Sequence, residues 1–348
     1  MNFKKLLLFP LISICLTSCG TGEQGGPNME LDNIQTTSFM RFPNIQIEVN
    51  QRLCIDNFII ENEGTEIFIY DESYVEFKDN NLYGKKVGST YLLVKVNDEY
   101  QKVEIEIKEE GSLSRAWNIS DMKEDETIVA FGDSVTAEAT IGSPRQYVYN
   151  LASKYKLNYL KNYAIGGTTG TYMYEGSNIW KEYKTLTDVL DGPRRVKEAV
   201  DNHELDGVNY AFIAYGHNDQ YFQPPITVEG DDIYNIDNFD NAHSFKGSYR
   251  FMINYLRKAS PNIKIILLNC TYSEYCLDSG RTYGSTYLYE DYRKAIDEIA
   301  IEMDCKTIDP WNYMKTHFDA YNRKVNYKDV VHLSQTGHKK LSDYIDKF

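Results

Sequence analysis

The stretch TIVAFGDSV, residues 127–135, decides the fold of the larger part of this chain. The apolar run Thr127–Ala130 leads into Phe, Gly, Asp and Ser, so a buried strand ends in a tight turn. Ser134 then stands at the carboxyl end of that strand. A turn serine would look the same, so the role of Ser134 depends on what the ends of the other strands carry.

From residue 127 onward, strand-like runs alternate with helical patterns, which is typical of an α/β domain. We predict a flavodoxin-like three-layer sandwich around a parallel sheet, covering residues 127–348. The expected strands are 127–131, 158–164, 208–214, 263–269 and 306–308. The expected helices are 145–155, 194–200, 249–258, 289–303 and 341–347, with Ser334 as a candidate N-cap before the last one.

Residues 31–108 show a different pattern, in which apolar and polar residues alternate over short segments. Period-two alternation predicts half-buried strands and a small all-β sandwich. The stretch YDESYVEFKDNNLYGKKVGSTYLLVKV, residues 70–96, resembles bacterial Ig-like domains of group 2. That resemblance implies a spacer or adhesion module rather than chemistry. Residues 109–126, polar and charged around Trp117, are predicted to be the linker.

The first residues have the features of an export signal. Lys4 and Lys5 precede the apolar run Leu6–Leu16, and LTSC follows, so residues 1–18 are predicted to be a lipoprotein signal peptide. The ending resembles a bacterial lipobox, which implies that Cys19 is lipidated and anchors an exported protein to a membrane. Residues 19–30 are Gly-rich and predict a flexible tether. A plain secretory signal with a stray cysteine is the alternative.

Charge and cysteine content exclude several kinds of partner. The 348 residues carry a net charge of −14 and no basic cluster beyond the start, so nucleic acid is not expected to bind. The cysteines beyond the signal show no CxxC spacing, so no metal site is predicted. Cys270 and Cys276 are placed either to form a disulfide or to remain buried thiols. An acidic loop lacks the glycine and closing glutamate of a calcium-binding EF-hand, so it is predicted to be solvated: Asp231, Asp232, Asp237 and Asp240.

Four unusual clusters fall at strand ends or just before the last helix. They are GDSV (132–135), NYAIGGTT (162–169), GHND (216–219) and DVVHLSQTGH (329–338). Ligands of open α/β sheets bind at the carboxyl ends of the strands, so these clusters are expected to meet at one edge.

Together and in this order, the four clusters resemble the SGNH (GDSL-type) hydrolase family. The resemblance covers about residues 127–348 and implies a role for each matching residue. Ser134 matches the nucleophile, and Asp329 and His332 match the acid and the base. Gly167 matches the backbone N–H donor of the oxyanion hole, and Asn218 matches its side-chain amide donor.

The residue types also fit this chemistry on their own terms. A serine hydroxyl becomes a good nucleophile only when a base removes its proton, and a histidine titrates near neutral pH. Asp329, three residues before His332, can hold one ring nitrogen while the other faces Ser134. An oxyanion needs fixed donors, for which the N–H of Ser134 is the natural third member beside Gly167 and Asn218. No cofactor or metal is expected, and the elbow motif GxSxG is absent around Ser134.

Simpler structural interpretations exist for each residue taken singly, as a turn serine, a flexible glycine loop or a capping aspartate. Asp309 is the alternative orienting acid, although the proline after it suggests a turn. His338 stands near the start of the last helix and is expected to be structural.

Three long stretches, 168–188, 221–244 and 271–287, are rich in tyrosine and tryptophan. Such rings present apolar faces with a polar tip and suit sugars. We therefore expect an ester hydrolase that removes short acyl groups, acetyl above all, from a polysaccharide. Alternatives are a general esterase, lipase or thioesterase, an acyltransferase, or a non-catalytic surface glycan-binding protein. The aromatic residues are Tyr172, Tyr174, Trp180, Tyr183, Tyr221, Phe222, Tyr272, Tyr275, Tyr283 and Tyr287.

Overall fold

The computed structural model describes residues 44–55, 65–78, 81–96, 99–113, 115–137, 146–173, 191–228, 243–274, 286–318 and 323–348. The chain forms two compact units, Met1–Ala116 and Trp117–Phe348. The division falls inside the segment 109–126 that the sequence predicts as linker. Trp117 and Ile119 belong to the second unit, where the N–H of Ile119 donates to the carbonyl of Phe348 at 2.9 Å. The predicted signal peptide, Cys19 and the tether lie outside the described residues.

The first unit is built from strands alone within the described residues. One sheet has the order β1-β7-β6-β3, with β1 parallel to β7 and the other pairs antiparallel, and a second has the order β2-β5-β4. The strands are β1 (Asn44–Glu48), β2 (Arg52–Cys54), β3 (Thr65–Ile69), β4 (Val75–Lys78), β5 (Asn81–Gly84), β6 (Gly88–Val96) and β7 (Glu99–Lys108).

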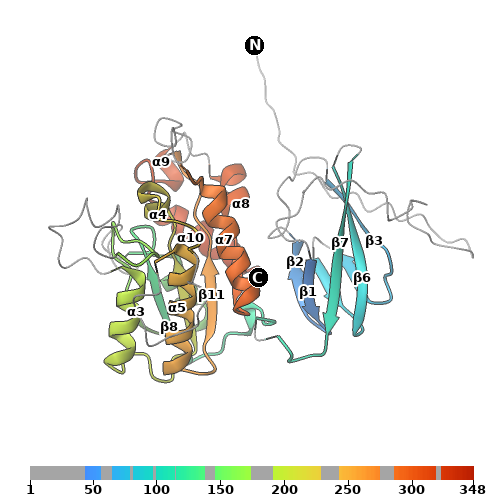
Figure 1. Cartoon of the computed structure of the whole chain (residues 1–348), viewed down its shortest axis with the longest axis horizontal. Helices are drawn as coiled ribbons and strands as arrows, with labels where there is room; N and C mark the ends of the chain where they lie inside the picture. The colour runs from blue at the N-terminus through green and yellow to red at the C-terminus, as the bar shows by residue number, and fades with distance from the viewer. Residues whose placement is uncertain are drawn as a thin grey trace, which may run out of the picture. The chain divides into compact units, whose positions relative to one another are not determined.

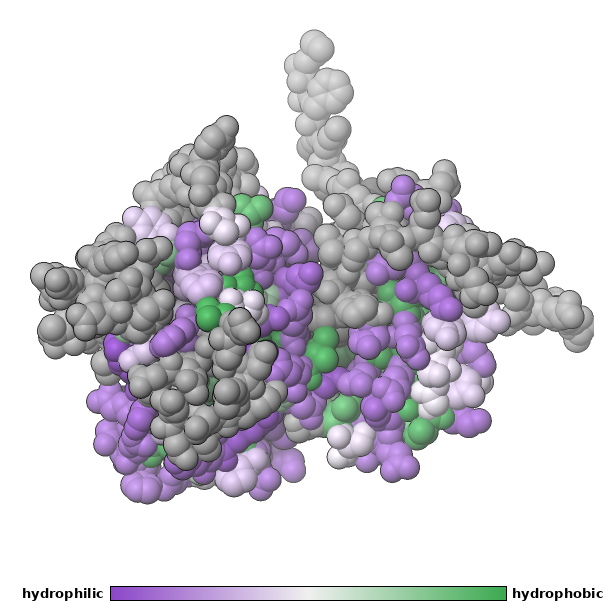
Figure 2. Space-filling view, viewed as in Figure 1, coloured by the Kyte–Doolittle hydropathy of each residue, from purple (hydrophilic) through white to green (hydrophobic). Residues whose placement is uncertain are grey.

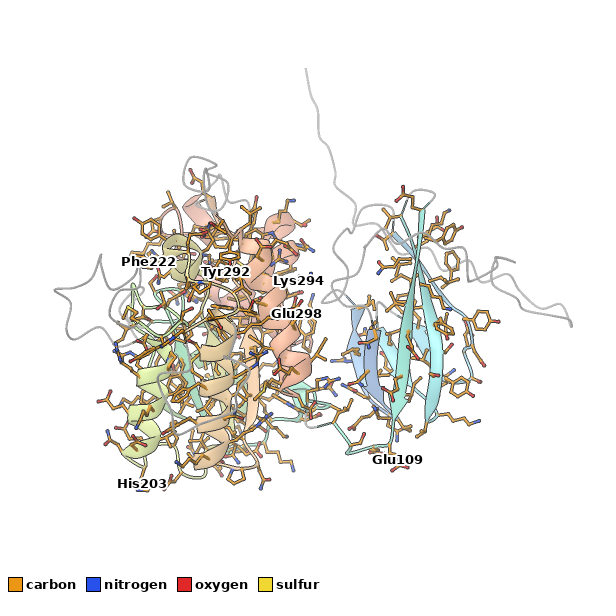
Figure 3. All side chains as sticks on the ribbon, in the orientation of Figure 1. Glu109, His203, Phe222, Tyr292, Lys294 and Glu298 are labelled. Atoms are coloured by element: carbon orange, nitrogen blue, oxygen red, sulfur yellow. The ribbon has the colours of Figure 1, made fainter. Side chains whose placement is uncertain are left out.

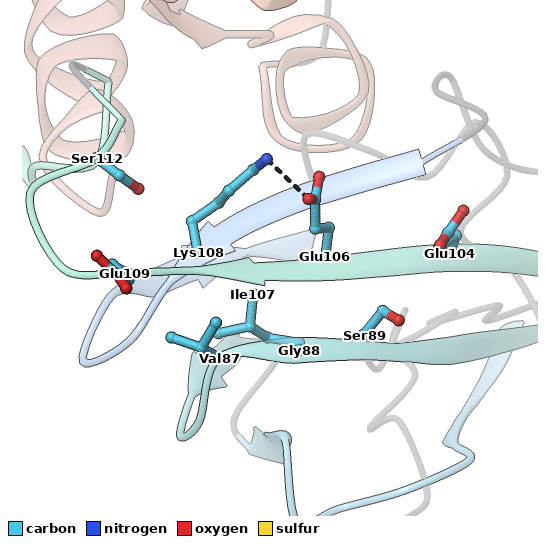
Figure 4. Close-up of a pocket in the computed structure, with 9 residues that line it drawn as sticks. All are labelled: Val87, Gly88, Ser89, Glu104, Glu106, Ile107, Lys108, Glu109 and Ser112. Atoms are coloured by element: carbon cyan, nitrogen blue, oxygen red, sulfur yellow. Dashed lines mark ion pairs between the residues drawn. The ribbon is translucent and has the colours of Figure 1, made fainter.

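Alternate side chains of these strands fill the core of the first unit, as period-two patterning requires. Ile45 and Ile105 are paired in register and are buried together with Leu92 and Val94 of β6. The opposite face is polar near the end of β7, where a groove of about 510 Å³ runs along β6 and β7. Figure 4 shows this groove and the ion pair of 2.7 Å between Lys108 and Glu106 on one of its sides.

The second unit contains a five-stranded parallel sheet with the order β12-β11-β10-β8-β9. Counted from β8 in chain order, this is the flavodoxin-like order 2-1-3-4-5. The predicted fold class is therefore confirmed. The chain reverses its direction of strand addition between β8 and β10, which is the switch point where such sheets bind ligands. The strands are β8 (Thr127–Gly132), β9 (Asn158–Asn162), β10 (Tyr210–Ala214), β11 (Lys264–Leu268) and β12 (Lys306–Ile308).

Helices cover both faces of this sheet. α3 (Gly192–Asp201), α5 (Phe245–Ala259) and α7 (Tyr289–Glu302) pack side by side over one face (Figure 1). α1 (Tyr147–Tyr155) and α10 (Gln335–Ile345) pack together over the other face, where Tyr147 meets Phe212 of β10. Each strand of the sheet centre is apolar on both sides because both sides are covered.

Capping side chains explain where several helices begin. Ser244 and Ser334 each accept a hydrogen bond from a backbone N–H three residues on, at 3.0 and 3.1 Å. Ser334 is the predicted N-cap, yet α10 begins at Gln335, earlier than the apolar pattern from Leu341 indicated. Three short helices were not predicted: α4 (His217–Phe222), α8 (Trp311–His317) and α9 (Arg323–Asn326).

α7 illustrates how one helix separates its two faces. Tyr292 is fully buried and its hydroxyl donates to the carbonyl of Pro224 at 2.8 Å. Lys294 and Glu298 lie on the other side of the same helix, 4.0 Å apart (Figure 3). The described surface in Figure 2 is mostly hydrophilic, with scattered apolar residues. Among the described residues, no helix has the length and apolar content needed to cross a membrane.

Candidate active site

Ser134 follows β8 in a turn that the neighbouring strand holds tightly. A Cβ at Gly132 would lie 2.8 Å from the carbonyl oxygen of Ala214 in β10, so only glycine fits there. The carboxylate of Asp133 then accepts the N–H of Val135 at 2.9 Å, and its own carbonyl accepts the N–H of Thr136 at 3.1 Å. These bonds fix the backbone on both sides of Ser134.

The structure brings His332 to Ser134 from the far end of the chain. His332 Nε2 lies 2.8 Å from Ser134 Oγ, and His332 Nδ1 lies 2.7 Å from Asp329 Oδ2. Asp329 Oδ1 also accepts the backbone N–H groups of His332 and Val331, at 2.7 and 2.9 Å. A serine, a ring and a carboxylate in this order can remove the hydroxyl proton and stabilise the resulting imidazolium.

The electrostatics of this turn favour a charged Asp329. Partial burial alone would raise the pKa of its carboxyl group. The hydrogen bonds from the His332 and Val331 backbone and the nearby imidazole outweigh that effect and hold the pKa below its usual value. The side chains remain accessible, with 27% of His332 and 45% of Asp329 exposed.

The turn after β9 and the start of α4 carry the two predicted oxyanion donors other than Ser134. The turn after β9 contains Gly167 at φ +81°, and a Cβ at Gly166 would lie 3.5 Å from that of Ser134. Asn218 lies in the first turn of α4, and its Nδ2 donates to the carbonyl of Thr168 at 2.7 Å. The second hydrogen of that amide takes no part in this bond, which is compatible with the predicted role of Asn218 as an oxyanion donor.

Below this edge the titratable groups Asp133 and His217 are buried. Burial raises the pKa of Asp133 to about 7, against hydrogen bonds from the backbone of Val135 and His217, and the charge of Asp219 adds to the rise. His217 is held between Thr271 Oγ1 at 2.9 Å and the hydroxyl of Tyr289 at 3.4 Å. Burial lowers its pKa to about 4, so His217 is neutral near pH 7.

The two alternatives considered from the sequence lie in other surroundings. Asp309 is buried against Arg293, and its Oδ1 accepts the N–H of Trp311 at 2.9 Å, which begins α8. Asp329, not Asp309, is the carboxylate at His332. His338 is buried against the ring of Tyr147, and burial lowers its pKa to about 4.

Several predictions fall on residues that the structure does not describe. Cys270 is buried, but its predicted partner Cys276 lies outside the described residues. The four aspartates of the predicted acidic loop and the central parts of the three aromatic stretches also lie outside them. Of the aromatic residues, Tyr221 on α4 is 47% exposed, and Tyr272 is buried.

Sequence reasoning did not give Asp133 and Asp219 a role, although both stand inside the predicted clusters. Asp219 is fully buried and accepts three hydrogen bonds from the loop after β9. The available signal was an acidic residue beside two of the three predicted oxyanion donors, Ser134 and Asn218. A buried acid there needs hydrogen-bond donors, and a neighbouring loop is the natural source of them.

The family comparison agrees with this geometry. The sequence profile of the GDSL-like Lipase/Acylhydrolase family matches residues 130–340, more than half of the chain. The chain belongs to this family. Membership makes this GDSL-like protein an esterase or acylhydrolase. No curated protein sequence matches the chain.

Solved structures of similar fold cover about two thirds of this GDSL-like chain. One is a protein from Lactobacillus plantarum, with 16% identity and a TM-score of 0.46 over 65% of this chain and 96% of that one. Another is a putative GDSL-like lipase from Parabacteroides merdae, with 14% identity and a TM-score of 0.43 over 66% and 98%. A third is an acetylxylan esterase from Geobacillus stearothermophilus, with 18% identity and a TM-score of 0.39 over 65% and 94%.

Proposed function

We propose that this protein is a serine ester hydrolase that removes short acyl groups, acetyl above all, from a polysaccharide outside the cytoplasm. The observation that carries the proposal is the chain of contacts Asp329–His332–Ser134, at 2.7 and 2.8 Å. These contacts support the proposal because a carboxylate, an imidazole and a serine hydroxyl are joined by two consecutive hydrogen bonds.

The reaction follows from these contacts in two halves. His332 Nε2 takes the proton of Ser134 Oγ as this oxygen attacks the ester carbonyl, and Asp329 stabilises the imidazolium. The carbonyl oxygen becomes negative and is held by the N–H groups of Ser134 and Gly167 and the amide of Asn218. The imidazolium then gives its proton to the leaving alcohol. Water repeats the steps on the acyl-enzyme and releases the acid.

The substrate class is inferred from what lies around this edge. Tyr221 is one turn along α4 from Asn218 and exposes nearly half its surface, so a ring face is available to a sugar. The net charge of −14 disfavours an anionic substrate. A neutral, acetylated glycan meets both conditions.

The nucleophile is tested with Ser134→Ala and the matched control Ser153→Ala on the exposed side of α1. With a chromogenic acetate ester, we expect Ser134→Ala to lose at least about 10⁴ in kcat and Ser153→Ala to match the wild type. A fluorophosphonate probe should label the wild type at Ser134, as located by peptide mass spectrometry. Wild-type turnover by Ser134→Ala excludes the mechanism.

The acyl length is tested separately, because the triad does not fix it. Acetate and octanoate esters of one alcohol are compared by kcat/KM, followed by acetate release from acetylated glycans. We expect acetate to be the better ester. Faster octanoate turnover would reject the deacetylase proposal and leave the serine hydrolase intact.

We also propose that Cys19 is lipidated after removal of residues 1–18, so that the enzyme is exported and membrane-anchored. The support is the order of a basic start, an apolar run and LTSC. Cys19→Ser should move the protein from the membrane fraction to the soluble fraction of its host. Unchanged partitioning would reject the anchor. The first unit is proposed to be an Ig-like spacer that holds the esterase away from the membrane.

A further inference from the structure

A buried carboxylate that takes no part in the triad holds the loop after β9. Asp219 Oδ2 accepts the N–H of Gly170, and its Oδ1 accepts the N–H of Thr171, both at 2.9 Å. The hydroxyl of Thr171 donates to the same Oδ1 at 2.6 Å. Asp219 itself is 0% exposed.

The neighbouring residue on α4 holds the same loop at an earlier position. Asn218 Nδ2 donates to the carbonyl of Thr168 at 2.7 Å. Gly167, whose N–H is assigned to the oxyanion, directly precedes Thr168. Two consecutive side chains of α4 therefore bracket residues 168–171, the segment that directly follows the predicted oxyanion donor Gly167. Asn218 is itself the other predicted donor beyond Ser134.

The loop has little room to shift within this bracket. A Cβ at Gly170 would lie 2.8 Å from Cβ of Tyr215 and 3.0 Å from the ring of Tyr249, so the backbone is packed against buried aromatic rings. Burying a charge is unfavourable unless hydrogen bonds compensate it. Burial raises the pKa of Asp219 to about 6, and the bonds from Thr171 and Gly170 oppose that rise.

We propose that Asp219 is a positioning residue that sets the oxyanion hole, because it fixes the Gly167 turn relative to Asn218 and Ser134. The inference rests on the proposed serine hydrolase function and adds a residue that does not touch the substrate. In this role Asp219 keeps the donors aligned with the position where the oxyanion forms, before the substrate binds. Loss of this alignment affects the transition state more than the bound ester.

The first test is Asp219→Asn, which keeps size but places an amide N–H₂ against backbone N–H donors. We expect kcat on the acetate ester to fall about 10- to 100-fold, with KM within about twofold. The matched control is Asp191→Asn. Asp191 is also a fully buried acid, and it accepts the N–H of Met173 at 3.0 Å further along the same chain segment. We expect that control to lose stability without a comparable loss of kcat.

A double-mutant cycle with Asn218→Ala separates alignment from general destabilisation. If both residues act through one oxyanion hole, the kcat loss of the double variant will be smaller than the product of the two single losses. Multiplicative losses, or an equal kcat loss in Asp191→Asn, would overturn the inference. Should Asp219→Asn fail to fold, Thr171→Val removes only the hydroxyl bond and should lower kcat about two- to fivefold, also less than multiplicatively with Asn218→Ala.

Failure of this inference and failure of the proposed function give different results. If Ser134→Ala keeps wild-type activity, the proposed serine mechanism is wrong, and the positioning role that rests on it is wrong as well. If Ser134→Ala is inactive while the Asp219 and Asn218 losses multiply, the hydrolase stands and the positioning role is wrong.

Discussion

The accessible edge of the esterase unit and the layer directly beneath it use acidic residues in opposite ways. At the edge, the side chain of Asp329 is 45% exposed, and hydrogen bonds keep its pKa below the usual value. In the layer beneath, Asp133 and Asp219 are 1% and 0% exposed, and burial raises their pKa to about 7 and 6. The edge acid contacts an imidazole as well as two backbone N–H groups, whereas the buried acids accept hydrogen bonds from backbone N–H groups and one threonine hydroxyl.

This difference shows how a site can combine proton transfer with rigidity. Asp329 must stay charged while the ring beside it changes charge, so its charge is supported from several sides. The buried acids transfer no proton in the proposed reaction. They contribute by joining backbone segments through hydrogen bonds. Asp133 links the turn after β8 to the start of α4, and Asp219 links α4 to the loop after β9.

The largest expected effect tests the edge of this comparison. Asp329→Asn should lower kcat by about 10⁴, because the amide favours the wrong tautomer of His332. The measurement is single-turnover acetate ester hydrolysis, with circular dichroism to verify folding. Asp309→Asn is the control, because Asp309 pairs with Arg293. That variant should be less stable, since the buried Arg293 loses one carboxylate partner and keeps that of Glu290, but its folded fraction should keep its rate. Equal rate losses in the two variants would contradict the assignment.

The oxyanion donors come next in size. Asn218→Ala should lower kcat by about 10²–10³ with little change in KM, because the amide acts on the oxyanion rather than on the ground-state ester. The measurement is the separate determination of kcat and KM for the acetate ester. An increase in KM alone would mean that Asn218 binds the substrate and that the oxyanion lies elsewhere.

Much of this second unit follows from its sequence because both faces of its sheet are covered. Strands that are buried on both sides read as continuous apolar runs, so β8, β10 and β11 were recognisable within two residues of their ends. The carboxyl ends of parallel strands lie at one edge of the sheet, so this part of the prediction does not require the loop conformations. The proximity of Ser134 and His332, 198 positions apart, rests instead on the resemblance of the four clusters to the family, because His332 lies between α9 and α10 rather than at the end of a sheet strand.

Other features could not be read from the sequence, for physical reasons. α4 has six residues and no apolar period. Two of its side chains, Asn218 and Asp219, are polar and form hydrogen bonds with the loop after β9. The early start of α10 depends on a cap by Ser334, not on hydrophobic spacing. The buried state of Asp219 depends on backbone donors from a distant segment, which no local pattern encodes.

The third prediction concerns pH and a base in the buried layer. His338 has a folded pKa of about 4 against an ordinary value of 6.5, so between these values the unfolded chain binds a proton that the folded chain does not. The wild type therefore loses stability from this residue as the pH falls below 6.5, by up to roughly 3 kcal/mol near pH 4. His338→Phe keeps the stack on Tyr147 and removes this loss.

Urea unfolding of wild type and His338→Phe at pH 5 and pH 8 measures the effect. The variant should gain more at pH 5 than at pH 8. Asp133 and Asp219 act with the opposite sign, because their raised pKa values make the folded state lose stability as the pH rises from about 4 to 7. These contributions cancel when the variant is compared with the wild type at each pH. An equal gain at both pH values would show that His338 is not held neutral by burial.

The smallest expected effect concerns the turn after β9 that contains Gly167. Gly167 has φ +81°, and a Cβ added there would meet no atom within 4 Å, so Gly167→Ala introduces backbone strain without a steric clash. We expect a loss of about 1 kcal/mol, or about 2–4 °C in Tm, and a smaller loss for Gly167→Asn, which tolerates this conformation better. Because α4 holds the loop from beneath, the strain should appear in stability, with kcat reduced less than about tenfold. A normal Tm with a large loss of kcat would mean that the turn relaxes outward and that the buried acids do not fix it.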